Sequence, residues 1–188
     1  MDVAAQLALE PAVNSHYKAM MSDAIPGSSE LCMRCGMCCD GTIYDTVAIH
    51  VEDHALLKAA GLPLSPEGDR YEMPQPCRAL SDKLCTIYKG RPGTCRRYAC
   101  EVLRRLEAGE ISAVRAGELV DTALAAAAAV AEHALPHEDR VAQRHRWQRQ
   151  CDDWQGDPVF HLRMMALNQL IDKEFRRPDE PLLERRQA

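Results

Sequence analysis

Long apolar runs are missing from this sequence of 188 residues. The longest, residues 123–131, is about half the ~20 residues that a membrane-spanning helix needs. The first twenty residues carry acids at Asp2 and Glu10 and a proline at position 11, so they lack the basic start and unbroken apolar core of a secretory signal. We therefore expect a soluble, cytoplasmic protein that does not associate with membranes.

The sequence also has no surplus of basic residues. Its formal net charge of −5 excludes a global attraction to nucleic acid, so we expect no nucleic-acid partner. Common catalytic signatures are missing as well: there is no glycine-rich dinucleotide loop after a strand, no Walker loop and no His-Glu-x-x-His. The radical-SAM spacing C-x3-C-x2-C fails because Thr42 occupies the third position. These absences direct attention to the cysteines.

Cysteine is abundant and strongly clustered. Eight of the nine cysteines lie between residues 32 and 100, and four of these form the run Cys32-x2-Cys35-x2-Cys38-Cys39. The other four are Cys77, Cys85, Cys95 and Cys100. Eight thiols are enough for two four-coordinate metal sites or for one larger cluster.

Metal binding explains this clustering better than disulfides do. Disulfides need an oxidising compartment, whereas a cytoplasmic setting keeps thiols reduced. Adjacent cysteines such as Cys38 and Cys39 seldom bridge each other, and C-x2-C turns recur in metal sites. We therefore expect all eight cysteines to be metal or cofactor ligands.

The spacing favours an iron–sulfur cluster, with zinc as the alternative. Cys32, Cys35 and Cys38 reproduce the x2, x2 spacing with which bacterial ferredoxins hold a 4Fe–4S cluster, although the Cys-x3-Cys-Pro ending of ferredoxins is missing. Adjacent cysteines diverge, so Cys38 and Cys39 suit two nearby centres or a polynuclear cluster better than one shared ion. Zinc stays open because eight thiolates also make two tetrahedral all-cysteine sites.

Other candidate residues have simpler interpretations. Cys151 shares a helical face with Trp147 and Trp154, so we expect it to pack in a core as a small hydrophobic residue. His50 and His54 lie nearest the cluster in sequence, and we expect them to be surface or packing residues because eight sulfurs already suffice. Two arginines, Arg91 and Arg96, are placed to donate hydrogen bonds near sulfur and to offset the charge of a thiolate cluster.

The periodicity predicts a few strands followed by long helices. We expect a strand over 46–51, a helix over 53–60 that stops at Gly61, and a proline-rich loop over 62–76. A hairpin of Cys77–Leu80 and Leu84–Tyr88 should pair Leu80 with Leu84 and bring Cys77 and Cys85 to one face. The remaining expected elements are helices over 12–22, 94–106, 112–135, 137–154 and 158–175.

Three helix boundaries have marked signals. Thr94 is the expected N-cap for the helix over 94–106, with Gly109 at its end. On such a helix Cys95 and Cys100 lie about 140° apart, so either the helix begins after Cys95 or the two sulfurs serve different metals. Asp157 with Pro158 marks the start of the last helix.

The cysteine-bearing segments resemble a known family. The strings CMRCGMCCDG, PCRAL, LCTIY, RPGTC and RRYAC resemble the YkgJ-type CxxCxxCC proteins, described as a "putative zinc- or iron-chelating domain", over roughly residues 32–100. Flagellin lysine N-methylases look similar in the same region. The resemblance implies metal chelation by Cys32, Cys35, Cys38, Cys39, Cys77, Cys85 and Cys95; local clustering adds Cys100.

The predicted fold class is α+β, mainly α, with a cysteine-rich, metal-nucleated module packed against a C-terminal helical hairpin or bundle. The expected organisation is an N-terminal arm (1–27), a metal-binding module (28–108), a helical region (109–177) and a tail (178–188). The expected function is a cytosolic iron–sulfur protein, as a redox or protein-modifying centre that acts on a protein partner or substrate. The alternatives are a zinc-stapled interaction module and a metal buffering or delivery protein.

Overall fold

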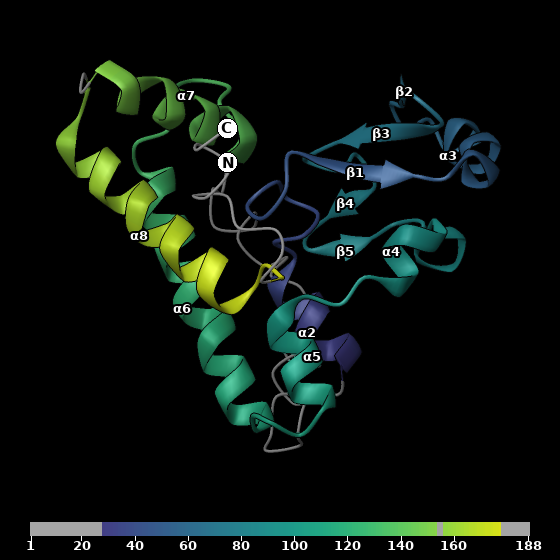
Figure 1. Ribbon diagram of the computed structural model, residues 1–188, viewed down its shortest axis with the longest axis horizontal. Coiled ribbons are helices and arrows are strands. Elements are labelled where there is room, and N and C mark those ends of the chain that lie inside the picture. The colour runs from purple at the N-terminus through teal and green to yellow at the C-terminus, as the bar shows by residue number, and fades with distance from the viewer. Residues whose placement is uncertain (1–27, 154–155, 178–188) are drawn as a thin grey trace, which may run out of the picture.

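Three long helices occupy one side of the molecule, and the strands lie on the other (Figure 1). The computed structural model describes residues 28–153 and 156–177 and has the expected mainly helical α+β fold. The helices are α2 (Ser28–Cys35), α3 (His54–Ala59), α4 (Gly93–Arg97), α5 (Glu101–Glu107), α6 (Ala113–Ala131), α7 (Arg140–Asp153) and α8 (Pro158–Glu174). Short 3-10 turns cover η2 (Val51–Asp53) and η3 (Tyr88–Gly90). The strands are β1 (Thr46–Ile49), β2 (Ser65–Glu67), β3 (Arg70–Pro74), β4 (Leu80–Ser81) and β5 (Leu84–Cys85).

The ends of the long helices follow local capping signals. The Ser112 hydroxyl accepts a hydrogen bond from the backbone N–H of Arg115 at 3.1 Å and caps α6. Asp157 caps α8 in the same way, with Pro158 in the first turn as predicted. The loop between α6 and α7 is longer than expected, because α6 ends at Ala131 and α7 begins only at Arg140. The helix expected over 12–22 and the tail over 178–188 lie outside the described residues, as does Trp154.

The proline-rich stretch 62–76, expected as a loop, instead contains two strands. β3 lies at the centre of an antiparallel sheet with the order β1-β3-β2, and Val47 of β1 faces Met73. The prolines are compatible with this sheet because Pro66 is on an edge strand and Pro74 is the last residue of β3. The strand predicted over 46–51 is confirmed, but it ends at Ile49 where η2 begins.

The β4–β5 hairpin is shifted by one residue from the prediction. Leu80 pairs with Cys85, and Ser81 pairs with Leu84, so the expected Leu80–Leu84 pairing is wrong. The connection has two residues, Asp82 and Lys83, both with positive φ (46° and 66°), as in the tight turns that match strand twist. Lys83 Nζ also donates a hydrogen bond to the Arg34 carbonyl at 3.2 Å, which attaches the turn to α2.

The single helix predicted over 94–106 is broken into α4 and α5. Between them Tyr98 and Cys100 have extended backbone angles (φ −71°, ψ 128° and φ −68°, ψ 166°). The N-cap of α4 is Pro92 rather than Thr94, whereas Gly109 follows the end of α5 as expected, with φ 72°. The break separates Cys95 from Cys100 by a change in chain direction.

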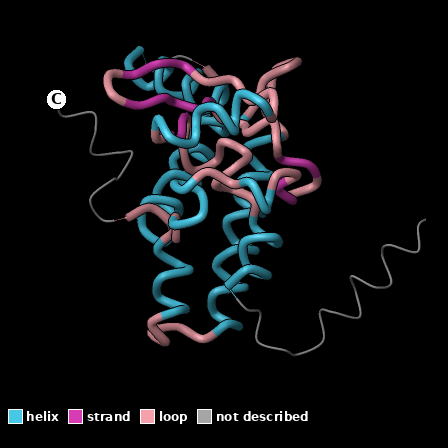
Figure 2. Tube along the Cα trace, turned by 90° about the vertical axis from the view of Figure 1, so that its right-hand side faces the viewer, coloured by secondary structure: helices cyan, strands magenta, loops and turns pink. Residues whose placement is uncertain are grey.

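Two hydrophobic cores form the interior. The larger one joins the long helices to α2 and α5, with Phe160, Trp147 and Val102 among its buried members. The smaller one lies under the sheet and α3 and includes Ile49, Leu57, Met73 and Ala79. Figure 2 shows the strands gathered towards one end of the helices. In the ranges that the structure describes, none of the helices combines the length and apolar character of a bilayer span.

Two buried arginines hold the helices to the loop that follows the cysteine run. Arg144 of α7 donates to the carbonyls of Thr42 (2.7 Å) and Gly41 (2.9 Å) and forms an ion pair with Asp45. Arg176, just after α8, donates from Nε to the Ile43 carbonyl at 3.1 Å and pairs with Asp172. Burial alone would raise the pKa of Asp45, but Arg144 and His145 outweigh it and lower that pKa. The loop is therefore fixed by charge-assisted hydrogen bonds.

We predict that Arg144→Ala lowers the free energy of unfolding by about 3 kcal/mol, because it leaves two buried carbonyls and the Asp45 carboxylate without their donor. Urea unfolding followed by circular dichroism measures the change. Arg104→Ala is the control: its side chain is 57% exposed and forms a salt bridge with Glu101 on the same helix, so its effect should stay within about 0.5 kcal/mol. Equal losses for the two variants would contradict this account of Arg144.

Candidate metal centre

The first two cysteines of the run lie in the last turn of a helix. Cys32 and Cys35 are three positions apart in α2, so they share one side of it. Gly36 ends the helix with φ 70°, and its N–H bonds to the Cys32 carbonyl at 3.0 Å. Cys35 is buried, whereas Cys32 is exposed. The helix thus presents one inner and one outer thiol.

Cys38 and Cys39 lie in a tight turn after this helix. The N–H of Cys39 donates to the Gly36 carbonyl at 2.9 Å, and the Cys39 carbonyl accepts from the N–H of Cys77 at 2.8 Å. The turn therefore joins α2 to the chain entering the β4–β5 hairpin. The thiols of Cys38 and Cys39 are adjacent in the sequence but have different neighbouring residues.

One group of thiols gathers where α2 meets α5. We name Cys32, Cys35, Cys38 and Cys100 the first quartet. Burial raises the pKa of Cys38 well above its ordinary value, and the thiols of Cys100 and Cys35 raise it further, each more strongly than its sequence neighbour Cys39 does. Burial also raises the pKa of Cys35 to about 12 and that of Cys100 to about 11, and Cys32 adds to both. The thiols that act most strongly on each buried member therefore belong to this quartet, although Cys39 acts on Cys38 more strongly than Cys32 does.

The second group lies beside the β4–β5 hairpin and α4. We name Cys39, Cys77, Cys85 and Cys95 the second quartet. Burial raises the pKa of Cys39 to about 12, and the thiols of Cys77, Cys95 and Cys85 add smaller increases. Burial raises the pKa of Cys95 to about 11, again with contributions from Cys77 and Cys85. By their influence on one another's pKa values, the eight cysteines of the predicted cluster divide into two groups of four.

Backbone amides point towards several of these sulfurs. Burial raises the pKa of Cys100, and the backbone of Leu103 in the first turn of α5 acts in the opposite direction. The backbone of Ala79 has the same effect on Cys77, and that of Met37 on Cys35. Amides near sulfur stabilise a thiolate, which is the form that binds metal.

The donor set of both quartets fits zinc or iron. All-thiolate surroundings are soft and select these metals, and buried thiols with raised pKa values exchange their protons for a metal ion. Within residues 28–153 and 156–177, no group of three or more Cys, His, Asp or Glu side chains is placed so that it could hold one metal ion. The fit therefore rests on the number, kind and burial of the donors.

Two of the remaining candidates contact other side chains. Cys151 packs against the larger core, with its Sγ 3.8 Å from Nδ1 of His161. His54 stacks on Tyr71 at 4.1 Å between ring centroids, and His50 is exposed. No disulfide joins any of the nine cysteines, all of which are described.

Sequence reasoning missed a tyrosine pair beside the first quartet. The hydroxyls of Tyr44 and Tyr98 are 3.1 Å apart, and their rings meet edge to face. Burial raises the pKa of Tyr98 far above its ordinary value, and the neighbouring Cys38 raises it further, so this hydroxyl stays protonated as a donor. The only signal in the sequence was the position of Tyr98 two residues before Cys100.

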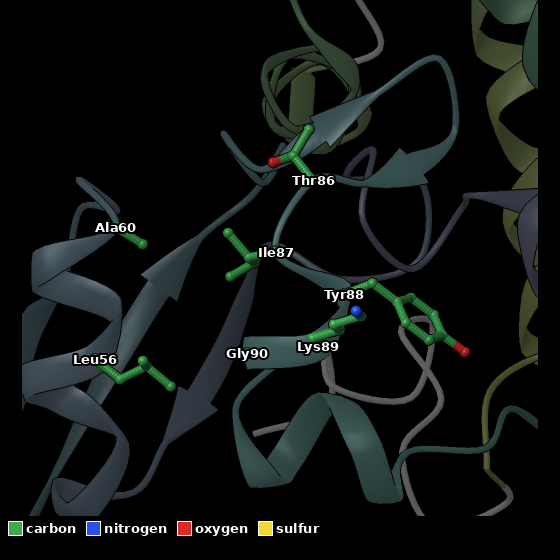
Figure 3. A pocket seen from close by; sticks show the side chains of 7 residues that line it. All are labelled: Leu56, Ala60, Thr86, Ile87, Tyr88, Lys89 and Gly90. Atoms are coloured by element: carbon green, nitrogen blue, oxygen red, sulfur yellow. The ribbon is translucent and has the colours of Figure 1, made fainter.

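A surface pocket lies near the second quartet but is not lined by it. The pocket has a volume of about 450 Å³ and lies between α3 and η3 (Figure 3). Its lining residues are Leu56, Ala60, Thr86, Ile87, Tyr88, Lys89 and Gly90. None of the eight cysteines lines it, so it gives no open approach to a metal held by them.

Comparison with known proteins identifies the cysteine-bearing part of the chain. Residues 31–116 match the family model CxxCxxCC, described as "Putative zinc- or iron-chelating domain". The match includes all eight cysteines of the two quartets. No curated protein and no solved structure matches the chain.

The turn that carries Cys38 and Cys39 gives a further prediction. Gly41 has φ 87°, and a Cβ there would meet Cγ2 of Val141 in α7 at 2.8 Å. We expect Gly41→Ala to cost about 1–2 kcal/mol for the left-handed backbone and about 1–3 kcal/mol for overpacking against a stiff β-branched residue. Urea unfolding measures the total.

Gly61→Ala is the matched control, since Gly61 has φ 73° but no atom within 4 Å of the added Cβ. It should show the backbone cost alone. If the two variants lose the same free energy of unfolding, the close approach of α7 to this turn is wrong.

Proposed function

We propose that the protein holds two metal centres, one in each cysteine quartet; residues 31–116, which match the CxxCxxCC family model of a "Putative zinc- or iron-chelating domain", support this proposal. Cys32, Cys35, Cys38 and Cys100 are the proposed ligands of the first centre. Cys39, Cys77, Cys85 and Cys95 are those of the second. The proposal is supported by the different neighbours of the two adjacent thiols: Cys100 and Cys35 act most strongly on the pKa of Cys38, whereas Cys77, Cys95 and Cys85 act most strongly on that of Cys39.

Four thiolates at each centre leave no coordination position for a substrate. Catalytic zinc keeps one position open for water or substrate, whereas structural zinc has four protein ligands. Clusters that transfer electrons are also ligated by four cysteines. The proposed centres therefore support an electron-transfer or structural role, in a cytosolic setting that keeps thiols reduced.

Iron–sulfur clusters are the first candidate for the cargo. The spacing of Cys32, Cys35 and Cys38 matches the three-ligand run of bacterial 4Fe–4S ferredoxins. Cys100 would provide the fourth ligand, and its position is fixed because the next N–H, that of Glu101, donates to the Phe175 carbonyl at 3.0 Å. The cluster would supply one-electron chemistry, while the chain provides ligands, backbone amides and burial.

Two zinc ions are the second candidate. The separation into two sets of four matches two tetrahedral zinc sites, each with four cysteine ligands. In this case the metal joins α2, the β4–β5 hairpin, α4 and the start of α5 without redox chemistry, and the domain would present a surface to a protein partner.

Metal analysis of protein purified without oxygen separates the two candidates. Iron with an equal amount of acid-labile sulfide and visible absorption would establish the iron–sulfur cargo. About two zinc ions per chain without sulfide would establish the structural module. Protein that is folded and contains neither metal, even after reconstitution, would overturn the proposal.

Serine substitutions test the division into quartets. We expect Cys38→Ser to lose the metal of the first centre and Cys39→Ser that of the second, so that each variant keeps about half of the wild-type metal. Cys151→Ser should keep all of it, since this cysteine belongs to neither quartet and its Sγ lies 3.8 Å from Nδ1 of His161. Complete metal loss from either single variant would favour one shared cluster instead of two centres.

A further inference from the structure

Positive charge is concentrated in the segment 83–97, which runs from the turn of the β4–β5 hairpin to the end of α4. The segment has five bases and no acid, whereas the whole chain has a net charge of −5. The bases are Lys83, Lys89, Arg91, Arg96 and Arg97, and all are exposed except Arg91, which is half-buried. Figure 1 shows α4 on the strand side of the molecule, away from the long helices. This part of the surface therefore has the opposite charge to the protein as a whole.

The five bases form no ion pair with any carboxylate in the part of the chain that the structure describes. Eight arginines elsewhere in that part each form one. A carboxylate does approach α4, but Asp53 accepts its hydrogen bond from the backbone N–H of Gly93, at 2.7 Å. Like charges that lack partners repel one another, and an acidic partner would relieve this repulsion.

Contacts within the segment hold three of the head groups in place. The guanidinium carbon of Arg91 lies 3.8 Å from the centroid of the Tyr88 ring. Nη1 of Arg96 donates to the Arg91 carbonyl at 2.6 Å. The guanidinium of Arg97 folds back over Gly93, where an added Cβ would lie 2.8 Å from its Nη1. Head groups that are already ordered lose less conformational entropy when they bind, and each keeps N–H donors for a carboxylate.

An apolar pocket adjoins these bases. It is the surface pocket of about 450 Å³, with Leu56 on one side, Tyr88 and Lys89 on the other and Ile87 between them (Figure 3). Lys89 is itself one of the five bases, and the Tyr88 ring carries Arg91, so the pocket and the bases form one continuous surface. Leu56 and Tyr88 are 48% and 49% exposed. An apolar pocket beside charged groups suits an apolar side chain in a charged segment.

We propose that this surface, made of segment 83–97 and the adjoining pocket, binds an acidic segment of a protein partner that inserts an apolar side chain into the pocket. Carboxylates of the partner would pair with the guanidinium groups. A protein suits the surface better than a nucleic acid does, because surfaces that bind unpaired bases present aromatic faces for stacking. Here Tyr88 is the aromatic residue of the surface, and Arg91 already lies over its ring.

The inference adds a partner to the proposed metal-binding function and rests on that function in one respect. Cys85 precedes η3 and Cys95 lies in α4, so metal bound by these two cysteines would hold the bases and the pocket in place from both ends. The surface itself consists of residues other than the proposed ligands. Its failure and the failure of the metal centres can therefore be measured separately.

Fluorescence anisotropy with a labelled synthetic peptide tests the proposal on the full-length, metal-loaded protein. The probe is a short run of glutamates with a central pair of leucines, and the matched probe has alanines in place of the leucines. We expect the leucine peptide to bind about tenfold more tightly, because leucine buries more apolar surface than alanine in the pocket. Binding of both peptides should weaken as salt is added, since salt screens exposed charges.

Charge reversal tests the basic part of the surface. Lys89→Glu combined with Arg96→Glu should bind the leucine peptide at least about tenfold more weakly, because like charges across an interface repel. The matched control, Arg104→Glu with Arg115→Glu, reverses two arginines that are 57% and 56% exposed on other helices, and it should stay close to wild type. Leu56→Gln should remove the preference for the leucine peptide. If the charge-reversed variant does not fold, glutamine at both positions replaces it in the comparison.

The inference is wrong if the folded wild type does not bind the leucine peptide, if it binds the two peptides equally, or if the two double variants lose the same affinity. Tighter binding of an oligothymidylate of matched charge would also overturn it, in favour of a nucleic acid. Metal analysis of the same sample tests the proposed function. Wild-type protein that holds metal without binding the peptide would leave the metal centres and remove the docking surface. Peptide binding by protein that takes up no metal, even after reconstitution, would do the reverse.

Discussion

The arrangement of this molecule depends on the burial of two arginines against one loop. Arg144 from α7 and Arg176 after α8 donate to three consecutive carbonyls, those of Gly41, Thr42 and Ile43. A buried guanidinium is tolerated only when its donors are satisfied, and these carbonyls lie outside regular secondary structure. The arginines therefore supply the donors that the carbonyls need, and the carbonyls supply acceptors for the arginines. The loop between Cys39 and β1 is thus held by arginines that lie 102 to 133 positions further along the chain.

That fixed loop allows two adjacent thiols to belong to different groups. Cys38 packs against the larger core, while the carbonyl of Cys39 accepts a hydrogen bond from the N–H of Cys77, just before the hairpin. The extended residues between α4 and α5 likewise place Cys95 and Cys100 in different groups. Short connections therefore link the two quartets at two places, and the proposed centres form one unit with the domain around them.

The surroundings of the quartets point to stable, closed centres. Most of the thiols are buried or half-buried, amides lie near several sulfurs, and the surface pocket is lined by none of the eight. Buried, fully ligated metal suits electron transfer or structural support, since both need protection from solvent more than access to it.

Local features could be predicted from the sequence: the grouped cysteines, the mainly helical α+β fold, the first strand, and the start of α8 at Asp157 and Pro158. These features depend on spacing and on capping chemistry within a few residues. The strands in the proline-rich stretch, the register of the hairpin and the break between α4 and α5 could be seen in the folded molecule alone. Each of these depends on contacts between distant segments, such as Lys83 with the Arg34 carbonyl or Arg144 with Gly41, and such contacts leave no periodic pattern in the sequence.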